Sequence, residues 1–310
     1  MRSLVTGGAG FIGSHVVDGL LSRGDEVAVV DDLSTGRREN LEPAESAGAV
    51  LHVADITERP ALDVVFSSFR PQRVFHLAAQ VDVRRSVADP VFDAMTNVAG
   101  TINVLECARI AQAERVVFSS TGGALYGEAE TIPSPEDTPI RPMSAYGQSK
   151  HAAETYCGLY RRLHGLSTVG VRYANVYGPR QDPLGEGGVV AIYCGQVRSG
   201  ERPVVFGDGR QTRDFVHVSD IVAANLAAAG GDAEGAYNIG CGQETSVLDL
   251  VAAFRELAGD DFEPIFEPPR AGEVSRSCLD PSRARRELGW EPTIGLHDGL
   301  SQTLESLQRR

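Results

Sequence analysis

The chain has 310 residues and a mass of 33.1 kDa, enough for one large domain or for two domains that share an interface. Apolar residues make up 42% of the chain and charged residues 23%, as in an average globular protein, which excludes extensive disorder. The 29 Lys and Arg residues against 42 Asp and Glu residues give a net charge of −13, which argues against nucleic acid or an anionic membrane as the main partner.

Short β-branched runs alternate with longer helical patterns in the first half of the chain. The sequence predicts strands at residues 3–6, 26–30, 50–53, 73–77, 115–119 and 167–172, and its longest helical patterns cover residues 91–112 and 144–164. Strands that are continuously apolar and separated by helices indicate a parallel sheet with both faces covered. The first half therefore predicts an α/β fold with a doubly wound parallel Rossmann sheet.

The alternation ends after about residue 175. Segments 179–188, 207–212 and 263–273 are rich in Gly, Pro and charged residues. Helices are expected over 219–229 and 296–310, and a strand over 236–239 that returns to the main sheet. The predicted division is a Rossmann domain over 1–175, with a return segment near 215–241, and a smaller C-terminal α/β domain over 176–310 without that segment.

Cellular location and metal content are also predicted from the sequence. No apolar stretch reaches the ~18 residues of a membrane span, and the first residues lead into a predicted strand without a signal-peptide core. The cysteines are odd in number and far apart, which favours neither a disulfide framework nor a metal site; they are Cys107, Cys157, Cys194, Cys241 and Cys278. We expect a cytoplasmic protein that binds no membrane and no metal ion.

A glycine-rich motif follows the first predicted strand and begins the first predicted helix. It reads Thr6-Gly7-Gly8-Ala9-Gly10-Phe11-Ile12-Gly13. Glycines at these positions permit a tight turn and let the backbone approach a pyrophosphate at the positive end of the helix. Asp31 ends the second predicted strand, where a carboxylate accepts hydrogen bonds from a ribose 2′-hydroxyl and repels a 2′-phosphate. The pattern predicts NAD rather than NADP; the alternative is a glycine-rich turn with a surface aspartate.

Tyr146 and Lys150 are four residues apart on a predicted helix, so their side chains share one face. Lys150 is the only lysine, and the other 28 of the 29 basic residues are arginine. A tyrosine that acts as a base near neutral pH needs its pKa lowered from ~10 by ~3 units, or ~4 kcal/mol. A nearby ammonium group favours the phenolate. We interpret Tyr146 as a catalytic base and Lys150 as its partner; the alternative is an exposed pair without a role.

Three hydroxyl side chains end the fifth predicted strand: Ser119, Ser120 and Thr121. The carboxyl ends of the strands form the ligand crevice of a doubly wound sheet, so these hydroxyls are expected to face a substrate. For this segment alone, hydroxyls that cap a strand end are the alternative.

Further motifs extend the pattern from Ser3 to about Trp290. They read His76-Leu77-Ala78-Ala79-Gln80, Asn97-Val98-Ala99-Gly100-Thr101, Tyr146-Gly147-Gln148-Ser149-Lys150, Arg172-Tyr173-Ala174-Asn175-Val176-Tyr177-Gly178-Pro179 and Thr212-Arg213-Asp214-Phe215-Val216-His217-Val218. With the glycine-rich motif, they resemble the extended short-chain dehydrogenase/reductase superfamily and, within it, the UDP-glucose 4-epimerase family. The resemblance implies redox-neutral inversion at C4 of UDP-glucose or UDP-galactose through a 4-keto intermediate, with NAD bound, in galactose metabolism.

The resemblance also implies a role for each matching residue. Thr121 would bond the sugar O4, Tyr146 would be the base, and Lys150 would orient the nicotinamide ribose. The cofactor-binding residues would be Gly7, Gly10, Phe11, Ile12, Gly13, Asp31, Asp32, Ser34, Thr35, Gly36, Asp55, Ile56, Leu77, Ala78, Ala79, Gln80, Asn97, Ser119, Tyr146, Lys150 and Tyr173. The substrate-binding residues would be Thr121 and Tyr146, then Asn175, Arg213 and Arg270 at the diphosphate, Val189, Val204 and Phe206 around the uracil, and Arg84 in a loop after the fourth strand.

The segment after Thr121 favours epimerisation over related reactions. Relatives that dehydrate sugar nucleotides carry an acidic pair there, and decarboxylating relatives carry a glutamate nearby. This chain has Gly122-Gly123 instead. Without a carboxylate at this place, elimination lacks its acid or base.

Two alternative functions stay open at this point. One is an epimerase of another sugar nucleotide, such as UDP-N-acetylglucosamine, UDP-glucuronate or a dTDP-sugar, because the family's pocket gate falls near the small residue Ser277. The other is a non-catalytic NAD-binding protein. The resemblance further implies a homodimer that packs through the helices near 91–112 and 144–164.

Overall fold

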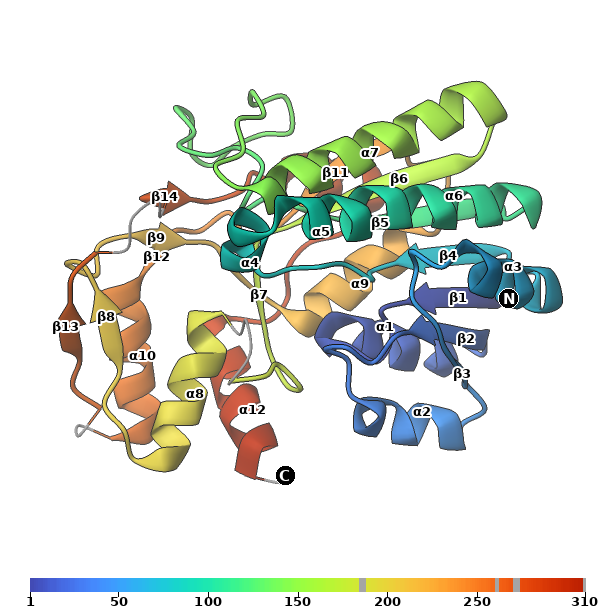
Figure 1. Cartoon of the computed structure of the whole chain (residues 1–310). Coiled ribbons are helices and arrows are strands. Elements are labelled where there is room, and N and C mark those ends of the chain that lie inside the picture. Colours follow the sequence, from blue (N-terminus) through green and yellow to red (C-terminus); the bar gives the residue numbers. More distant parts are fainter. Residues whose placement is uncertain (184–187, 260–261, 270–273, 309–310) are drawn as a thin grey trace.

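Seven parallel strands form one central sheet in the order β11-β6-β5-β4-β1-β2-β3 (Figure 1). The computed structural model describes residues 1–183, 188–259, 262–269 and 274–308. The strand order reverses direction between β1 and β4, which is the mark of a doubly wound sheet. The predicted α/β Rossmann fold is therefore confirmed. The strands are β1 (Arg2–Thr6), β2 (Glu26–Asp31), β3 (Val50–Val53), β4 (Arg73–His76), β5 (Arg115–Thr121), β6 (Ser167–Tyr173) and β11 (Gly235–Ile239).

Helices cover both faces of this sheet. On one face lie α1 (Phe11–Ser22), α9 (Val218–Ala228) and α11 (Ser282–Leu288), which share an apolar cluster with Val5 and Val117. On the other lie α3 (Arg59–Phe69), α6 (Gly100–Ile110) and α7 (Ala145–His164), which share a cluster with Leu4 and Phe118. Neighbouring residues of a strand point to opposite faces, so Leu4 and Val5 belong to different clusters. Burial on both faces explains why these strands are continuously apolar.

The helical pattern over 91–112 forms three consecutive pieces. They are α5 (Pro90–Ala94), the π-helical turn η2 (Met95–Ala99) and α6. Single π turns inside helices occur frequently at functional sites. Asn97, one of the residues predicted to bind the cofactor, is buried in this turn.

The prediction that Arg84 lies in a loop is wrong. Residues after β4 form α4 (Val83–Ala88), and Asp82 begins this helix by accepting a hydrogen bond from Arg85 N at 2.8 Å. A capping carboxylate of this kind satisfies one of the free N–H groups at a helix start. Arg84 therefore lies on an exposed helical surface.

A smaller part of the molecule lies to the left of the sheet in Figure 1 and has its own apolar core. In that core the ring of Tyr193 meets those of Phe254 and Phe262 edge to face. This part contains α8 (Val189–Ser199), α10 (Val247–Ala258), α12 (Leu296–Gln308), β8 (Val204–Phe206), β9 (Thr212–Arg213), β12 (Thr245–Ser246), β13 (Ile265–Glu267) and β14 (Arg276–Ser277). Two short strands, β7 (Asn175–Tyr177) and β10 (Phe215–His217), pair in parallel. Along the chain, β7 is followed by α8 and β10 is followed by α9. The domain boundary at residue 175 stays a prediction.

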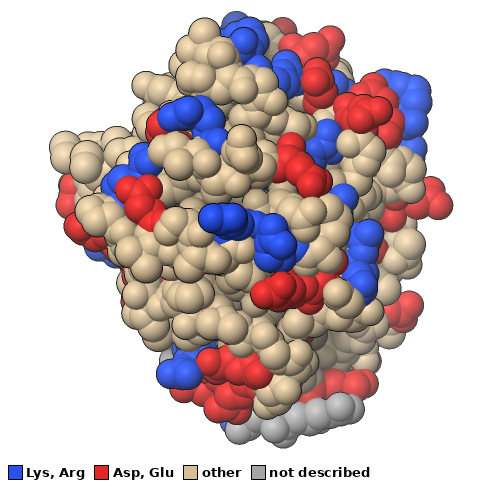
Figure 2. Space-filling view, turned by 90° about the vertical axis from the view of Figure 1, so that its right-hand side faces the viewer, with Lys and Arg blue, Asp and Glu red and all other residues tan. Residues whose placement is uncertain are grey.

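The remaining short helices are η1 (Arg38–Leu41) and α2 (Glu42–Ser46), between β2 and β3. Within the described residues, no helix combines the length and apolar character that a membrane span needs. Figure 2 shows the face on the N-terminal side of the molecule, where acidic and basic side chains are interspersed among uncharged ones. The net charge of −13 is therefore not gathered into one area of this face.

Candidate active site

The glycine-rich motif forms the turn between β1 and α1. Gly7 has a φ of +71°, and a Cβ there would lie 2.6 Å from the backbone N of Ala78, in the segment that follows β4. A Cβ on Gly13 would lie 2.0 Å from Gly7 O, so the helix touches the turn through backbone alone. No side chain of the described residues caps the start of α1, which leaves its first N–H groups to face an anion. This cradle fits a pyrophosphate.

Asp31 ends β2 beside this turn and is only 6% exposed. Its Oδ2 accepts a hydrogen bond from Ala9 N at 2.9 Å, and its Oδ1 accepts one from Leu33 N at 2.9 Å. Burial raises the pKa of this carboxyl. Each carboxylate oxygen has a second lone pair, so both oxygens can still accept a hydrogen bond from a ribose hydroxyl.

The other residues predicted around the adenosine follow β2 and β3. Asp32 accepts hydrogen bonds from Ser34 N and Ser34 Oγ at 2.9 and 2.7 Å, and a Cβ on Gly36 would lie 2.6 Å from Asp31 Oδ1. Gly36 therefore lies against the Asp31 carboxylate, whereas Thr35 is exposed. After β3, Asp55 accepts from Thr57 N at 2.8 Å, and Ile56 is buried.

Gln80 and Asn97 are joined by reciprocal hydrogen bonds. Gln80 lies in the segment after β4, next to Leu77, Ala78 and Ala79, and Asn97 lies in the π turn η2. Gln80 N donates to Asn97 Oδ1 and Asn97 Nδ2 donates to Gln80 O, both at 2.9 Å. Both side-chain amides also donate to Oδ1 of Asp93, at 2.9 and 3.0 Å. Asp93 is completely buried, and its Oδ2 has no partner among the described residues. Asp93 is not among the residues predicted from the sequence; its spacing of four residues before Asn97 is the signal that could have pointed to it.

Tyr146, Lys150 and Thr121 come together where β5 ends and α7 begins. Ser144 caps α7 by accepting from Gly147 N at 3.1 Å. The Tyr146 hydroxyl interacts with the side chain of Thr121, which opposes the rise of its pKa. Lys150 is one turn further on and 3% exposed, with its Nζ 4.7 Å from the ring centroid of Phe118. The structure thus assembles the three residues that the sequence analysis predicted as catalytic.

Burial has opposite effects on the pKa of the two titratable groups. It raises the pKa of Tyr146 to about 12 and lowers the pKa of Lys150 to about 8, because each charged form loses contact with water. A tyrosine base needs the opposite shift. Ionisation of Tyr146 near neutral pH would therefore need positive charge beside the phenol.

Ser119 and Tyr173 lie on the adjacent strands β5 and β6. Tyr173 Oη donates to Asn225 Oδ1 at 2.9 Å and also interacts with the side chain of Ser119. Burial raises the pKa of Tyr173 well above its ordinary value. Tyr173 is therefore a neutral hydrogen-bonding group in this position.

Some of the residues predicted to bind substrate lie at the edge of the sheet, and the others lie in the smaller part of the molecule. Asn175 begins β7, and a Cβ on Gly123 would lie 3.6 Å from its Oδ1, so Asn175 faces the segment after Thr121. Arg213 lies on β9 and pairs with Ser277 of β14 in the strand register. Val189 begins α8, whereas Val204 and Phe206 are the two ends of β8. Arg270 lies outside the described residues, and Arg84 projects from α4.

A family model described as GDP-mannose 4,6 dehydratase matches residues 4–303. The chain belongs to this family, one of the extended short-chain dehydrogenases/reductases. The UDP-glucose 4-epimerase of Mycolicibacterium smegmatis is 47% identical over 313 residues, which cover 100% of this chain and 99% of the relative.

Two solved structures of this dehydrogenase/reductase superfamily are also close. UDP-glucose 4-epimerase of Thermotoga maritima, crystallised with UDP-glucose, superposes with a TM-score of 0.96 at 46% identity, covering 100% of this chain and 99% of that one. UDP-glucose 4-epimerase of Thermus thermophilus, in complex with NAD, gives a TM-score of 0.93 at 43% identity, covering 99% of each chain. These similarities confirm the resemblance to UDP-glucose 4-epimerases that the motifs predicted.

Proposed function

We propose that the protein is an NAD-dependent UDP-glucose/UDP-galactose 4-epimerase. The contact between the Tyr146 and Thr121 hydroxyls, one helical turn from the buried Lys150, is the observation that carries this proposal. It supplies a base, a hydroxyl for the sugar O4 and a positive charge beside one another. The 47% identity to a UDP-glucose 4-epimerase over the full chain supports the same activity.

NAD fits the residues at the carboxyl edge of the sheet. The backbone cradle of Gly7 and Gly13 would hold the pyrophosphate, Asp31 would accept hydrogen bonds from the adenosine ribose, and Ile56 would contact the adenine. Bound NAD would accept a hydride from C4 of the sugar and return it to the opposite face. The predicted Rossmann domain over 1–175 would hold this cofactor, and the C-terminal domain over 176–310 would hold the nucleotide sugar.

The side chains of the chain itself would move the proton. Tyr146 takes the proton from the C4 hydroxyl, and Thr121 holds the sugar O4 through a hydrogen bond. Lys150 bonds the nicotinamide ribose and stabilises the phenolate, which a compact ammonium does better than a broad guanidinium. Asn175 and Arg213 would bind the diphosphate, so that a chain with a net charge of −13 holds an anion through a local site.

The packing around Gly122 supports epimerisation over dehydration. A Cβ on Gly122 would lie 2.3 Å from Cδ1 of Leu279 and 2.7 Å from its Cδ2. An acidic side chain at this place would displace Leu279, which is itself buried. A carboxylate at residue 122, which elimination requires, would therefore need Leu279 to move.

A second substrate class follows from the position of Ser277. Its pairing with Arg213 puts it beside the proposed diphosphate site. Because serine is small, we propose that the pocket also admits N-acetylated sugars. Turnover of UDP-N-acetylglucosamine at a rate within tenfold of that for UDP-glucose is expected, and activity on UDP-glucose alone would contradict this extension.

We further propose a cytoplasmic homodimer that packs through α5, α6 and α7. Apolar side chains on these helices and the adjacent π turn are exposed, with Val91 at 72%, Met95 at 53% and Leu163 at 65%. Burial of such side chains between two copies would remove them from water. Light scattering after size-exclusion chromatography is expected to give twice the mass of the chain, and the mass of one chain would contradict the proposal.

Proton NMR of the purified protein with UDP-galactose, without added NAD, tests the main proposal. Appearance of UDP-glucose is expected, with the cofactor retained through purification. If product forms only after NAD is added, the activity stands and the cofactor is loosely held. Absence of conversion in both conditions would contradict UDP-glucose 4-epimerisation.

A further inference from the structure

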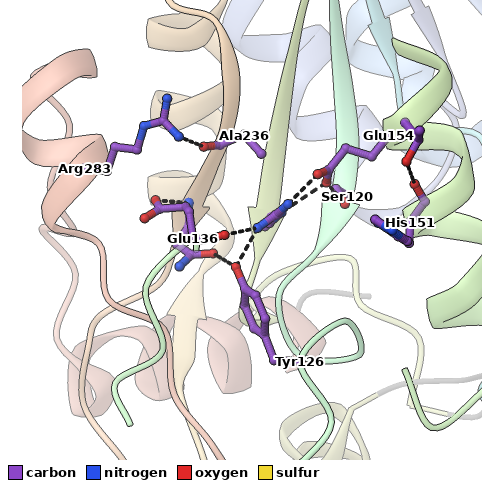
Figure 3. Close-up of polar contacts among 10 residues, drawn as sticks. Ser120, Tyr126, Glu136, His151, Glu154, Ala236 and Arg283 are labelled. Carbon is purple, nitrogen blue, oxygen red and sulfur yellow. Dashed lines mark hydrogen bonds and ion pairs between the residues drawn. The ribbon is translucent and has the colours of Figure 1, made fainter. Parts of the chain in front are cut away.

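A largely buried ion pair joins Glu154 of α7 to Arg172 of β6. Figure 3 shows Glu154 together with Ser120 and Tyr126 in the same network of polar contacts. Glu154 Oε1 accepts from Arg172 Nη2, and its Oε2 accepts from Arg172 Nε at 3.1 Å. The two side chains are only 14% and 7% exposed. Ser120 Oγ donates to Glu154 Oε2 at 2.7 Å. The pair therefore joins α7, β5 and β6 at the edge where the site lies.

Arg172 also fixes the segment between β5 and α7. Its Nη1 donates to Tyr126 Oη at 2.8 Å and to Glu136 O at 3.1 Å. Tyr126 Oη in turn donates to Asn238 Oδ1 on β11 at 2.8 Å. Every nitrogen of the guanidinium is thus engaged, and the segment that carries the chain from Thr121 to α7 is bonded to the sheet at two places.

Each member of this network is close in sequence to a residue of the proposed site. Glu154 follows Lys150 by one helical turn, so residues 146, 150 and 154 share one face of α7. Ser120 precedes Thr121 on β5, and Arg172 precedes Tyr173 on β6. A shift of α7 along the sheet would break the Glu154 hydrogen bonds and the contact between Tyr146 and Thr121 together.

We propose that Glu154 and Arg172 are positioning residues that hold Tyr146 on α7 in register with Thr121 on β5. Apolar packing alone is non-directional and tolerates small sliding movements, whereas two charged hydrogen-bonding groups have a fixed geometry. A base must lie about 2.6–3.2 Å from the proton that it takes. A misplacement of about 1 Å costs about 100-fold in rate. This inference rests on the proposed epimerase function.

The central variant replaces both partners by apolar groups of similar length, as Glu154→Leu with Arg172→Met. Replacement of a whole buried pair is often tolerated, whereas removal of one partner leaves a buried charge uncompensated. Glu154→Gln is the second variant, since it keeps the size and removes only the charge. Glu287→Gln is the matched control, because Glu287 also accepts from an arginine and a hydroxyl, those of Arg283 and Tyr237, away from the site.

The holoenzyme variants are compared in kcat and KM for UDP-galactose, in melting temperature, in NAD affinity and in amide hydrogen exchange. For the double variant we expect kcat to fall about 100-fold, while KM and NAD affinity stay within about threefold and the melting temperature stays close to wild type. Exchange at residues 144–150 is expected to become faster. Glu154→Gln is expected to lower kcat about tenfold, and Glu287→Gln is expected to change none of these quantities.

Two results would overturn the proposal. One is a folded double variant with kcat within threefold of wild type. The other is a parallel loss of kcat, NAD affinity and melting temperature, which a merely structural pair would produce. Failure of the proposed function can be distinguished from failure of this proposal. In the first case the wild-type protein converts no UDP-galactose. The positioning role is then still tested by amide hydrogen exchange at the start of α7, which needs no turnover.

Discussion

Replacement of Tyr146 by phenylalanine isolates the contribution of one oxygen atom. The ring stays in place at the start of α7, and only the hydroxyl that interacts with the Thr121 side chain is lost. The backbone N of Tyr146, which donates to Ser86 Oγ at 3.0 Å, is unchanged by the substitution. The variant therefore removes the proposed base and leaves the helix and its cap intact.

The magnitude follows from the pKa of the buried phenol. With the pKa of Tyr146 at about 12, roughly 1 molecule in 10,000 carries the phenolate at pH 8. In the proposed mechanism, positive charge beside the phenol would have to supply about 5.5 kcal/mol to ionise it, at about 1.4 kcal/mol for each pH unit. A general base contributes about 10²–10⁴-fold to a rate. We therefore expect kcat to fall about 100- to 10,000-fold, with a loss of at most about 1 kcal/mol in stability for the polar contact of the hydroxyl.

Conversion of UDP-galactose to UDP-glucose, followed by proton NMR, measures the rate of Tyr146→Phe. Tyr156→Phe is the matched control, because Tyr156 lies on the same helix with 37% of its surface exposed and loses the same atom. NAD affinity of Tyr146→Phe is expected to stay within a few-fold of wild type. A rate within tenfold of wild type in a folded Tyr146→Phe variant would refute Tyr146 as the base.

Three further substitutions test the cation, the cofactor cradle and the core. Lys150→Met removes the ammonium proposed to favour the Tyr146 phenolate, so we expect the pKa of Tyr146 to rise. Because the phenolate is the active form, the acidic limb of a kcat–pH profile is expected to move to higher pH. Gly13→Ala puts a Cβ 2.0 Å from Gly7 O, and we expect NAD affinity, measured by titration calorimetry, to fall at least about 100-fold. Leu62→Ala empties part of the fully buried cluster beneath α3, and urea unfolding is expected to show a loss of about 2–5 kcal/mol.

Each of these variants has a control on the same chain. Arg in place of Lys150 keeps the charge and is still expected to be poor, because the guanidinium is broader than the ammonium. Gly295→Ala meets no atom within 4 Å and is expected to bind NAD normally. Val64→Ala, on α3 with Val64 67% exposed, is expected to lose less than about 1 kcal/mol. An unshifted profile for Lys150→Met, normal NAD affinity for Gly13→Ala, or an unchanged unfolding midpoint for Leu62→Ala would contradict the respective prediction.

The predicted strands are close to the observed ones because strands buried on both faces are continuous apolar runs. All but the first of the six begin at the same residue as the observed strands, and β5 extends two residues further than predicted, to Thr121. The extension matters, because it places Ser120 and Thr121 within a strand at the edge of the site. The helix α4 was missed, since its start depends on one capping carboxylate, Asp82, in a segment without helical periodicity.

The amino-acid sequence by itself determined the individual strands, the glycine turn and the helical spacing of Tyr146 and Lys150, because these depend on neighbours within a few residues along the chain. Only the tertiary structure decided which groups from distant parts of the chain contact one another. Glu154 and Arg172 are 18 residues apart, and Tyr126 and Asn238 are 112 apart, yet both pairs are hydrogen-bonded. A carboxylate or a guanidinium can pair with a group from any part of the chain, so no local pattern specifies the partner. The fold specifies it, by bringing the ends of β5, β6 and β11 to one edge and burying those groups there together.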